Sequence, residues 1–82
     1  MFGNREQINR KKAEEIVRNF KSEKVDTAIS YDGFLKCVEI HKMEKDPVLN
    51  ERLPVYTYIV FCRDGGSAAR FSEKLNNLRY GF

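Results

Sequence analysis

This 82-residue sequence has little of what usually builds a metal centre, since it contains two cysteines and one histidine. Without a C-x-x-C pair or a second histidine, a structural zinc site is not expected. Cys37 and His41, four residues apart in one strand, would lie roughly 13 Å apart and could not share an ion. The same separation argues against a Cys–His nucleophile pair, and no other nucleophile has a base beside it. We expect no metal, no cofactor and no enzymatic activity.

Long apolar runs are also missing. The longest, residues 55–62, contains Thr57 and two tyrosines, and it falls far short of the about 20 apolar residues that span a bilayer. The first residues are polar and lack the apolar segment of a signal peptide. We therefore expect a cytoplasmic protein with no membrane partner. Its cysteines are then expected to be thiols, because reducing compartments disfavour disulfides.

The composition is that of a folded domain, with 41% hydrophobic and 33% charged residues, which is too apolar for a disordered chain. We expect residues 1–82 to form a single domain. The net charge of +3 permits a nucleic-acid partner. It does not demand one, because charges of both signs are interspersed along the chain.

Two apolar stripes predict two helices. Asn4 stands at a cap position with Gln7 three residues on, which favours a helix from residue 4 to about residue 21. Its apolar stripe consists of Ile8, Ala13, Ile16, Val17 and Phe20. A second helix is expected over residues 68 to about 79, with Ser67 as its cap and Gly81 as its stop. Its stripe consists of Ala68, Phe71, Leu75 and Leu78.

Asp32-Gly33 between alternating apolar residues predicts a two-residue hairpin turn, because such a turn needs positive φ at both central positions. The strands on either side are expected over residues 25–31 and 34–43. The turn places Tyr31 opposite Phe34, Ile29 opposite Lys36, Thr27 opposite Val38, and Val25 opposite Ile40.

A third strand is expected over residues 55–62, which are rich in β-branched and aromatic side chains. Residues 45–54 contain two prolines and are predicted to be an irregular connection. The expected fold class is therefore α+β, in the order α-β-β-β-α. In the expected architecture, the three strands form an antiparallel sheet, and both helices pack on one face of it.

The register of the third strand decides what the other face carries, because a one-residue slip exchanges its two faces. We expect Ile40 to pair with Ile59 and Val38 with Phe61, which fills the core best. Cys37 and Cys62 would then be neighbours, as packed thiols or, less in keeping with a reducing compartment, as a cross-strand disulfide.

This register leaves an apolar and aromatic patch on the outer face, of the kind favoured at interfaces. The alternative is that the 45–54 connection or the C-terminal residues fold over it. The candidate partner-binding residues are Leu35, His41, Met43, Tyr56 and Tyr58. The candidate nucleic-acid-binding residues, on the first helix and the start of the second, are Arg10, Lys11, Lys12, Arg70 and Lys74.

The element order resembles that of double-stranded-RNA-binding domains, with a last helix that follows a glycine turn. Those domains carry a lysine cluster at the start of that helix, where this chain has Ser67-Ala68-Ala69-Arg70. The order is also similar to that of some small phage-encoded inhibitors of CRISPR effectors, which are non-enzymatic and occlude a site on their target. Both likenesses lie in element order and not in a residue motif, so no family is assigned.

From these features we expect a small non-enzymatic binding protein that docks a macromolecular partner through its open sheet face and the 45–54 loop. A phage or mobile-element inhibitor of a nucleic-acid-processing complex is one concrete version. The alternative is a nucleic-acid-binding domain that uses the first helix and the Arg70/Lys74 turn. A third option is a homodimer that pairs its outer sheet faces.

Overall fold

The first helix begins at Arg10, later than the sequence predicts. In the computed structural model, which describes residues 4–81, helix α1 spans Arg10–Ser22, and the Asn9 side chain accepts a hydrogen bond from the Lys12 N–H at 2.8 Å. Asn4–Gln7 forms strand β1 instead of a helical turn. Asn9 meets the same capping requirement as Asn4, and the preceding residues gain hydrogen bonds by joining the sheet.

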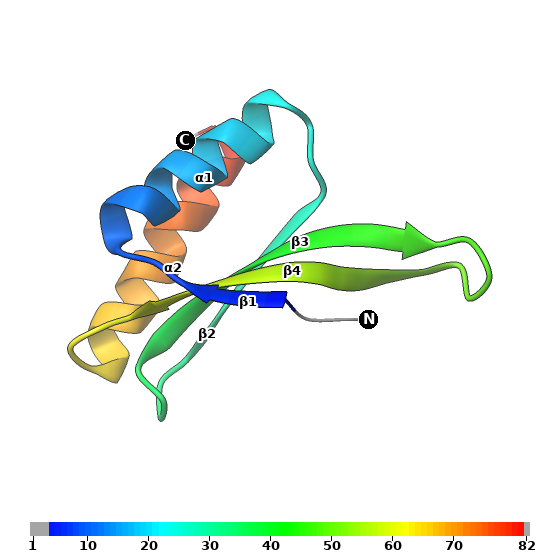
Figure 1. The fold of residues 1–82 in the computed structure, drawn as a ribbon. Coiled ribbons are helices and arrows are strands. Elements are labelled where there is room, and N and C mark those ends of the chain that lie inside the picture. Colours follow the sequence, from blue (N-terminus) through cyan, green and yellow to red (C-terminus); the bar gives the residue numbers. More distant parts are fainter. Residues whose placement is uncertain (1–3, 82) are drawn as a thin grey trace.

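The sheet has four strands, not three, and it is mixed, not purely antiparallel. Strands β2 (Thr27–Asp32), β3 (Cys37–Asp46) and β4 (Glu51–Phe61) are antiparallel neighbours, and β1 adds in parallel to β4, giving the order β1-β4-β3-β2. Helix α2 spans Gly65–Tyr80. Both helices lie on the same side of the sheet, as expected (Figure 1). The α+β class is therefore confirmed, and the three-stranded antiparallel detail is wrong.

The β2–β3 hairpin does not use the predicted two-residue turn. Asp32 pairs with Cys37, so the loop has four residues, 33–36. The Asp32 carboxylate accepts the N–H groups of Phe34 and Leu35, at 2.9 and 3.0 Å, and Lys36, not Gly33, takes positive φ. Each residue of β2 therefore pairs with a residue of β3 four positions later than predicted; Tyr31, for example, lies opposite Val38 instead of Phe34. Because four is an even number, the faces of both strands are as expected.

The register of β4 against β3 differs by one residue from the prediction. Ile40 pairs with Tyr58 and Val38 with Val60. The core already holds the larger side chains of Phe71 and Leu75, and from β4 it takes Val60, while Phe61 lies 55% exposed on the other face. A one-residue slip exchanges every side chain of the strand between the two faces.

Residues 45–54 form the end of a long hairpin, not an irregular connection. Strands β3 and β4 stay paired out to Asp46 and Glu51, and Val55 is an extra residue between the pairs Lys42–Tyr56 and Met43–Pro54. We call residues 43–54 the arm. The arm projects beyond the helices (Figure 1).

The core lies between the helices and the inner face of the sheet. It consists of Ala13, Val17, Val38, Ile40, Val60, Ala68, Phe71 and Leu75. Helix α2 starts earlier than predicted, because the Asp64 side chain, not Ser67, is the cap and accepts the Ser67 N–H at 2.7 Å. Gly81 ends the helix in a left-handed conformation with φ 84°, as expected.

The start of α2 lies directly against the β2–β3 loop, which makes Gly65 sensitive to substitution. A Cβ on Gly65 would lie 2.8 Å from the carbonyl oxygen of Gly33. We expect Gly65→Ala to lower the free energy of unfolding by about 1–3 kcal/mol, because backbone must shift to relieve the clash. Urea denaturation measures the change.

Gly66→Ala is the matched control. A Cβ there meets only side-chain atoms of Arg70 and Asp64, each at 3.4 Å, and alanine is the better helix former by about 1 kcal/mol. This variant should be as stable as the parent or more so. Equal stability of both variants would show that the loop moves away from the helix at little cost.

Candidate docking surface

Neither helix of the described residues covers the second face of the sheet, which we call the open face. Its side chains alternate along each strand with the buried Val38, Ile40 and Val60. The open face contains Arg5, Ala28, Ser30, Glu39, His41, Thr57, Ile59 and Phe61.

A row of hydrogen bonds crosses the middle of the open face. The Nε2 atom of His41 lies 3.3 Å from the Ser30 hydroxyl, and its Nδ1 atom lies 2.9 Å from the Thr57 hydroxyl. Beside this row Arg5 contacts Glu39 at 2.7 Å. The predicted site residue His41 is therefore on the open face, but its surroundings are polar, not aromatic. Such a surface offers hydrogen-bonding groups and charges rather than an apolar patch.

Tyr56 and Tyr58 lie on the helix side of the sheet, so they do not share a face with His41. Tyr58 packs against the core, with its ring centroid 6.2 Å from that of Phe20 and 4.8 Å from that of Tyr56. Burial raises the pKa of Tyr58. The Tyr56 hydroxyl donates to Glu6 at 2.7 Å, and this hydrogen bond raises the pKa of Tyr56. The expected aromatic patch on the outer face was wrong because of the one-residue register difference.

Leu35 and Met43 are also separated from one another. Leu35 is exposed in the 33–36 loop, whereas Met43 is half-buried at the root of the arm, where its N–H donates to the Asp26 carbonyl at 2.8 Å. The ten residues of β3 separate the two hairpin loops by roughly 33 Å. The five predicted partner-binding residues therefore do not form one surface.

Sequence reasoning missed that the two hairpin loops have the same design. In the 47–50 loop, Asp46 accepts the N–H groups of Val48 and Leu49, at 2.8 and 3.3 Å, and Asn50 has positive φ. Asp32 and Lys36 play the same parts in the 33–36 loop.

Each loop presents two apolar side chains to solvent. Phe34 and Leu35 are 90% and 59% exposed, and Val48 and Leu49 are 88% and 59% exposed. The signal shared by the two loops is an aspartate, one residue of any kind and two apolar residues. Only the second loop adds a residue that favours the left-handed region, Asn50.

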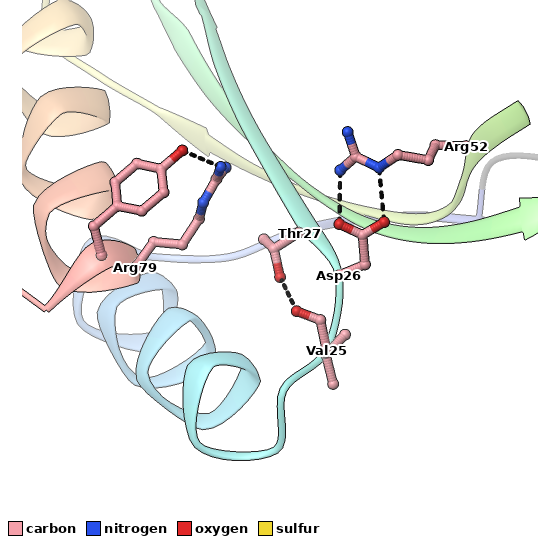
Figure 2. Close-up of polar contacts among 6 residues, drawn as sticks. Val25, Asp26, Thr27, Arg52 and Arg79 are labelled. Carbon is pink, nitrogen blue, oxygen red and sulfur yellow. Dashed lines mark hydrogen bonds and ion pairs between the residues drawn. The ribbon is translucent and has the colours of Figure 1, made fainter.

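An ion pair ties the arm to the start of β2. The Arg52 guanidinium donates two hydrogen bonds to the Asp26 carboxylate, each 2.7 Å long (Figure 2). The hydrogen bond from Arg52 lowers the pKa of Asp26, and the charge of Arg79 at the end of α2 acts in the same direction. This planar, two-bond geometry fixes the direction of the arm better than a single contact would.

The predicted nucleic-acid-binding residues lie on the helix layer, and several are engaged within the molecule. The Arg10 guanidinium stacks on the Phe71 ring, 4.4 Å from its centroid, and Lys74 lies 3.3 Å from the Glu14 carboxylate. Arg70 lies 3.4 Å from the Ser67 hydroxyl. Lys11 and Lys12 are exposed on the first turn of α1.

The cysteines are not neighbours in the sheet, because Cys37 pairs with Phe61 instead of Cys62. Both are free thiols, and burial raises the pKa of Cys37. Within residues 4–81, no three histidine, cysteine, aspartate or glutamate side chains are grouped so that they could hold a metal ion.

Neither α1 nor α2, the helices of the described part of the chain, is long and apolar enough to cross a membrane. Comparison with known proteins found no matching family model, curated protein or solved structure.

The two tyrosines should differ in their effect on stability. We expect Tyr58→Ala to lower the free energy of unfolding by about 2–3 kcal/mol, because it removes a half-buried ring from the core. Tyr56→Ala, which loses one exposed hydrogen bond, should cost about 1 kcal/mol. Urea denaturation of the two variants checks this difference. A small cost for both variants would instead favour the register predicted from the sequence, because that register places both tyrosines on the outer face.

The Asp26–Arg52 pair should control the titration of Asp26. Because the pKa of Asp26 is lowered from 3.8, the pair stabilises the fold above that pH, and this contribution is lost as the pH falls through the lowered pKa. Arg52→Gln should raise the pKa of Asp26 toward 3.8, as measured by carboxyl NMR. Arg5→Gln, which removes the partner of Glu39, is the control and should leave Asp26 unchanged.

Proposed function

We propose that this chain is a cytoplasmic, non-enzymatic binding protein that docks a protein partner through the arm and the open face. The observation that carries the proposal is the tip of the arm. Val48, at 88% exposure, and Leu49, at 59%, stand on a hairpin that projects beyond the helices and is tied to Asp26 by Arg52. Apolar side chains held out in this way have no packing role in the described fold, and they suit insertion into a pocket of a partner.

The open face supplies the second half of the proposed interface. Ser30 and His41 offer hydrogen-bonding groups, and the Arg5–Glu39 pair offers charges of both signs. Interfaces combine a small apolar anchor with a polar surround that fixes orientation. The tip would supply the anchor and the open face the polar surround.

Such a protein would act by covering a site on its partner, without chemistry of its own. A phage or mobile-element inhibitor of a nucleic-acid-processing complex is one form of this function. The likeness in element order to small phage inhibitors extends only from α1 to α2, because β1 precedes the order on which that likeness was based.

Nucleic acid is the second candidate partner. The observation that favours it is the packing of α1 on α2, which gathers Arg10 and Lys74 from distant parts of the chain. The exposed Lys11 and Lys12 lie beside them in sequence. Glu14 opposes this candidate, because its carboxylate contacts both Lys74 and Arg18.

Affinity capture from the native cells, with and without nuclease, tests the proposal. We expect a stoichiometric protein partner that survives nuclease and is lost with the double variant Val48→Ser and Leu49→Ser. The fold of this variant should be unchanged, because both side chains are exposed. Tyr80→Ser is the matched control, since Tyr80 is 60% exposed but lies on α2. It should capture the partner normally.

Two other outcomes would contradict the proposal. Recovery that vanishes with nuclease would move the function to nucleic acid, and substitution of Arg10, Lys11 and Lys12 by Gln should then reduce it. Loss of the partner with Phe34→Ser and Leu35→Ser, but not with the arm variant, would move the interface to the opposite end of β3.

A further inference from the structure

Strand β2 lies at one edge of the sheet, and its outer side faces no strand within residues 4–81. The Met43 N–H donates to the Asp26 carbonyl. This bond shows which residues along β2 form backbone hydrogen bonds with β3. In an antiparallel pair, every second residue turns its backbone groups away from the neighbouring strand. The backbone N–H and C=O groups of Thr27, Ile29 and Tyr31 therefore point outward.

Most of the β2 edge is unprotected. Edge strands are usually guarded by charged side chains, proline or a bulge. Residues 27–31, Thr-Ala-Ile-Ser-Tyr, contain none of these, and β2 pairs with β3 in unbroken register. The opposite edge differs, because β1 is only four residues long and carries Arg5 and Glu6. Within residues 4–81, one edge of the sheet is therefore guarded and the other is open.

The burial of Thr27 limits how a strand can add to β2. Thr27 is only 6% exposed, whereas Tyr31 is 53% exposed and Ser30 is also exposed. Ile29 is half-buried, so an added strand has better access to the outward groups of Ile29 and Tyr31 than to those of Thr27. An antiparallel register in which Ile29 lies opposite Tyr31 of the incoming strand uses these two residues alone.

That register is self-complementary, so the incoming strand can be β2 of a second copy of this chain. If the incoming strand is β2 of a second copy, Ile29 of each copy lies opposite Tyr31 of the other. Four backbone hydrogen bonds then form around a twofold axis at Ser30. The half-exposed Tyr31 ring packs beside a β-branched side chain, a favourable cross-strand pair. Ala28 lies opposite Asp32, so no like charges face each other.

We propose that two copies of this chain pair antiparallel along β2, centred on Ser30. Two four-stranded sheets then become one continuous sheet. The interface is isologous, as in most homodimers. This differs from a dimer that packs its sheet faces together, because edge pairing leaves both open faces uncovered.

Disulfide trapping tests the register. At the twofold axis the two copies of residue 30 form a non-hydrogen-bonded pair, whose Cα atoms lie about 4.5 Å apart, within the range for a disulfide. Ser30→Cys should become a covalent dimer under mild oxidation, on a non-reducing gel. Ala28→Cys, on the same face, is the control, since its two copies would lie roughly 13 Å apart. It should stay monomeric on the gel, as should the parent with its native cysteines.

A charge test measures the same contact without cysteine. Ser30→Lys places two ammonium groups opposite each other and should raise the dimer dissociation constant by up to about fivefold. Ala28→Lys places a lysine opposite Asp32 and should leave the constant unchanged or lower it. Sedimentation equilibrium from micromolar to millimolar concentration gives these constants. A parent chain that is monomeric throughout, or equal trapping of the two cysteine variants, would overturn the proposal.

Discussion

The rest of the structure depends on the pairing register of β4 against β3. Because Val38 lies opposite Val60 and Ile40 opposite Tyr58, these four side chains face the helices, and Thr57 and Phe61 face the other way. One residue of slip would reverse this arrangement and place Phe61 in the core. The register therefore determines both what the helices cover and what the open face offers.

The second constraint is length. Helix α1 has 13 residues and so measures roughly 20 Å, whereas the ten residues of β3 extend over roughly 33 Å. The helices cannot cover the whole hairpin, and its far end stands free as the arm. The extra residue Val55 marks the boundary between covered and free parts, since a bulge bends a hairpin and increases its twist. The Asp26–Arg52 pair then fixes the arm where helix packing ends.

The sequence predicted the elements whose signals are local. The apolar stripe through Ala13, Val17 and Phe20 and the stop at Gly81 gave both helices, and alternation gave the sheet faces of β2 and β3. Strand β1 was not predictable, because its pairing joins residues about fifty positions apart and its own sequence is polar. The turn at Asp32 was predicted wrongly. The Asp-Gly pair favours a two-residue turn, but the Asp32 side chain accepts two backbone N–H groups and so stabilises a four-residue loop instead.

The candidate site was harder to predict than the fold, because a shift of one residue in the pairing of β4 exchanges the side chains on its two faces. A single residue of error in β4 moved Tyr56 and Tyr58 to the helix side, while His41 stayed on the open face. Docking at the tip of the arm and the proposed dimer do not depend on this register. Docking at the arm rests on the exposure of Val48 and Leu49, and edge pairing rests on the backbone groups of β2. Since the arm tip is not part of the β2 edge, one copy can present Val48 and Leu49 to a partner and also pair along β2, whereas Ser30 belongs both to the open face and to the centre of the dimer.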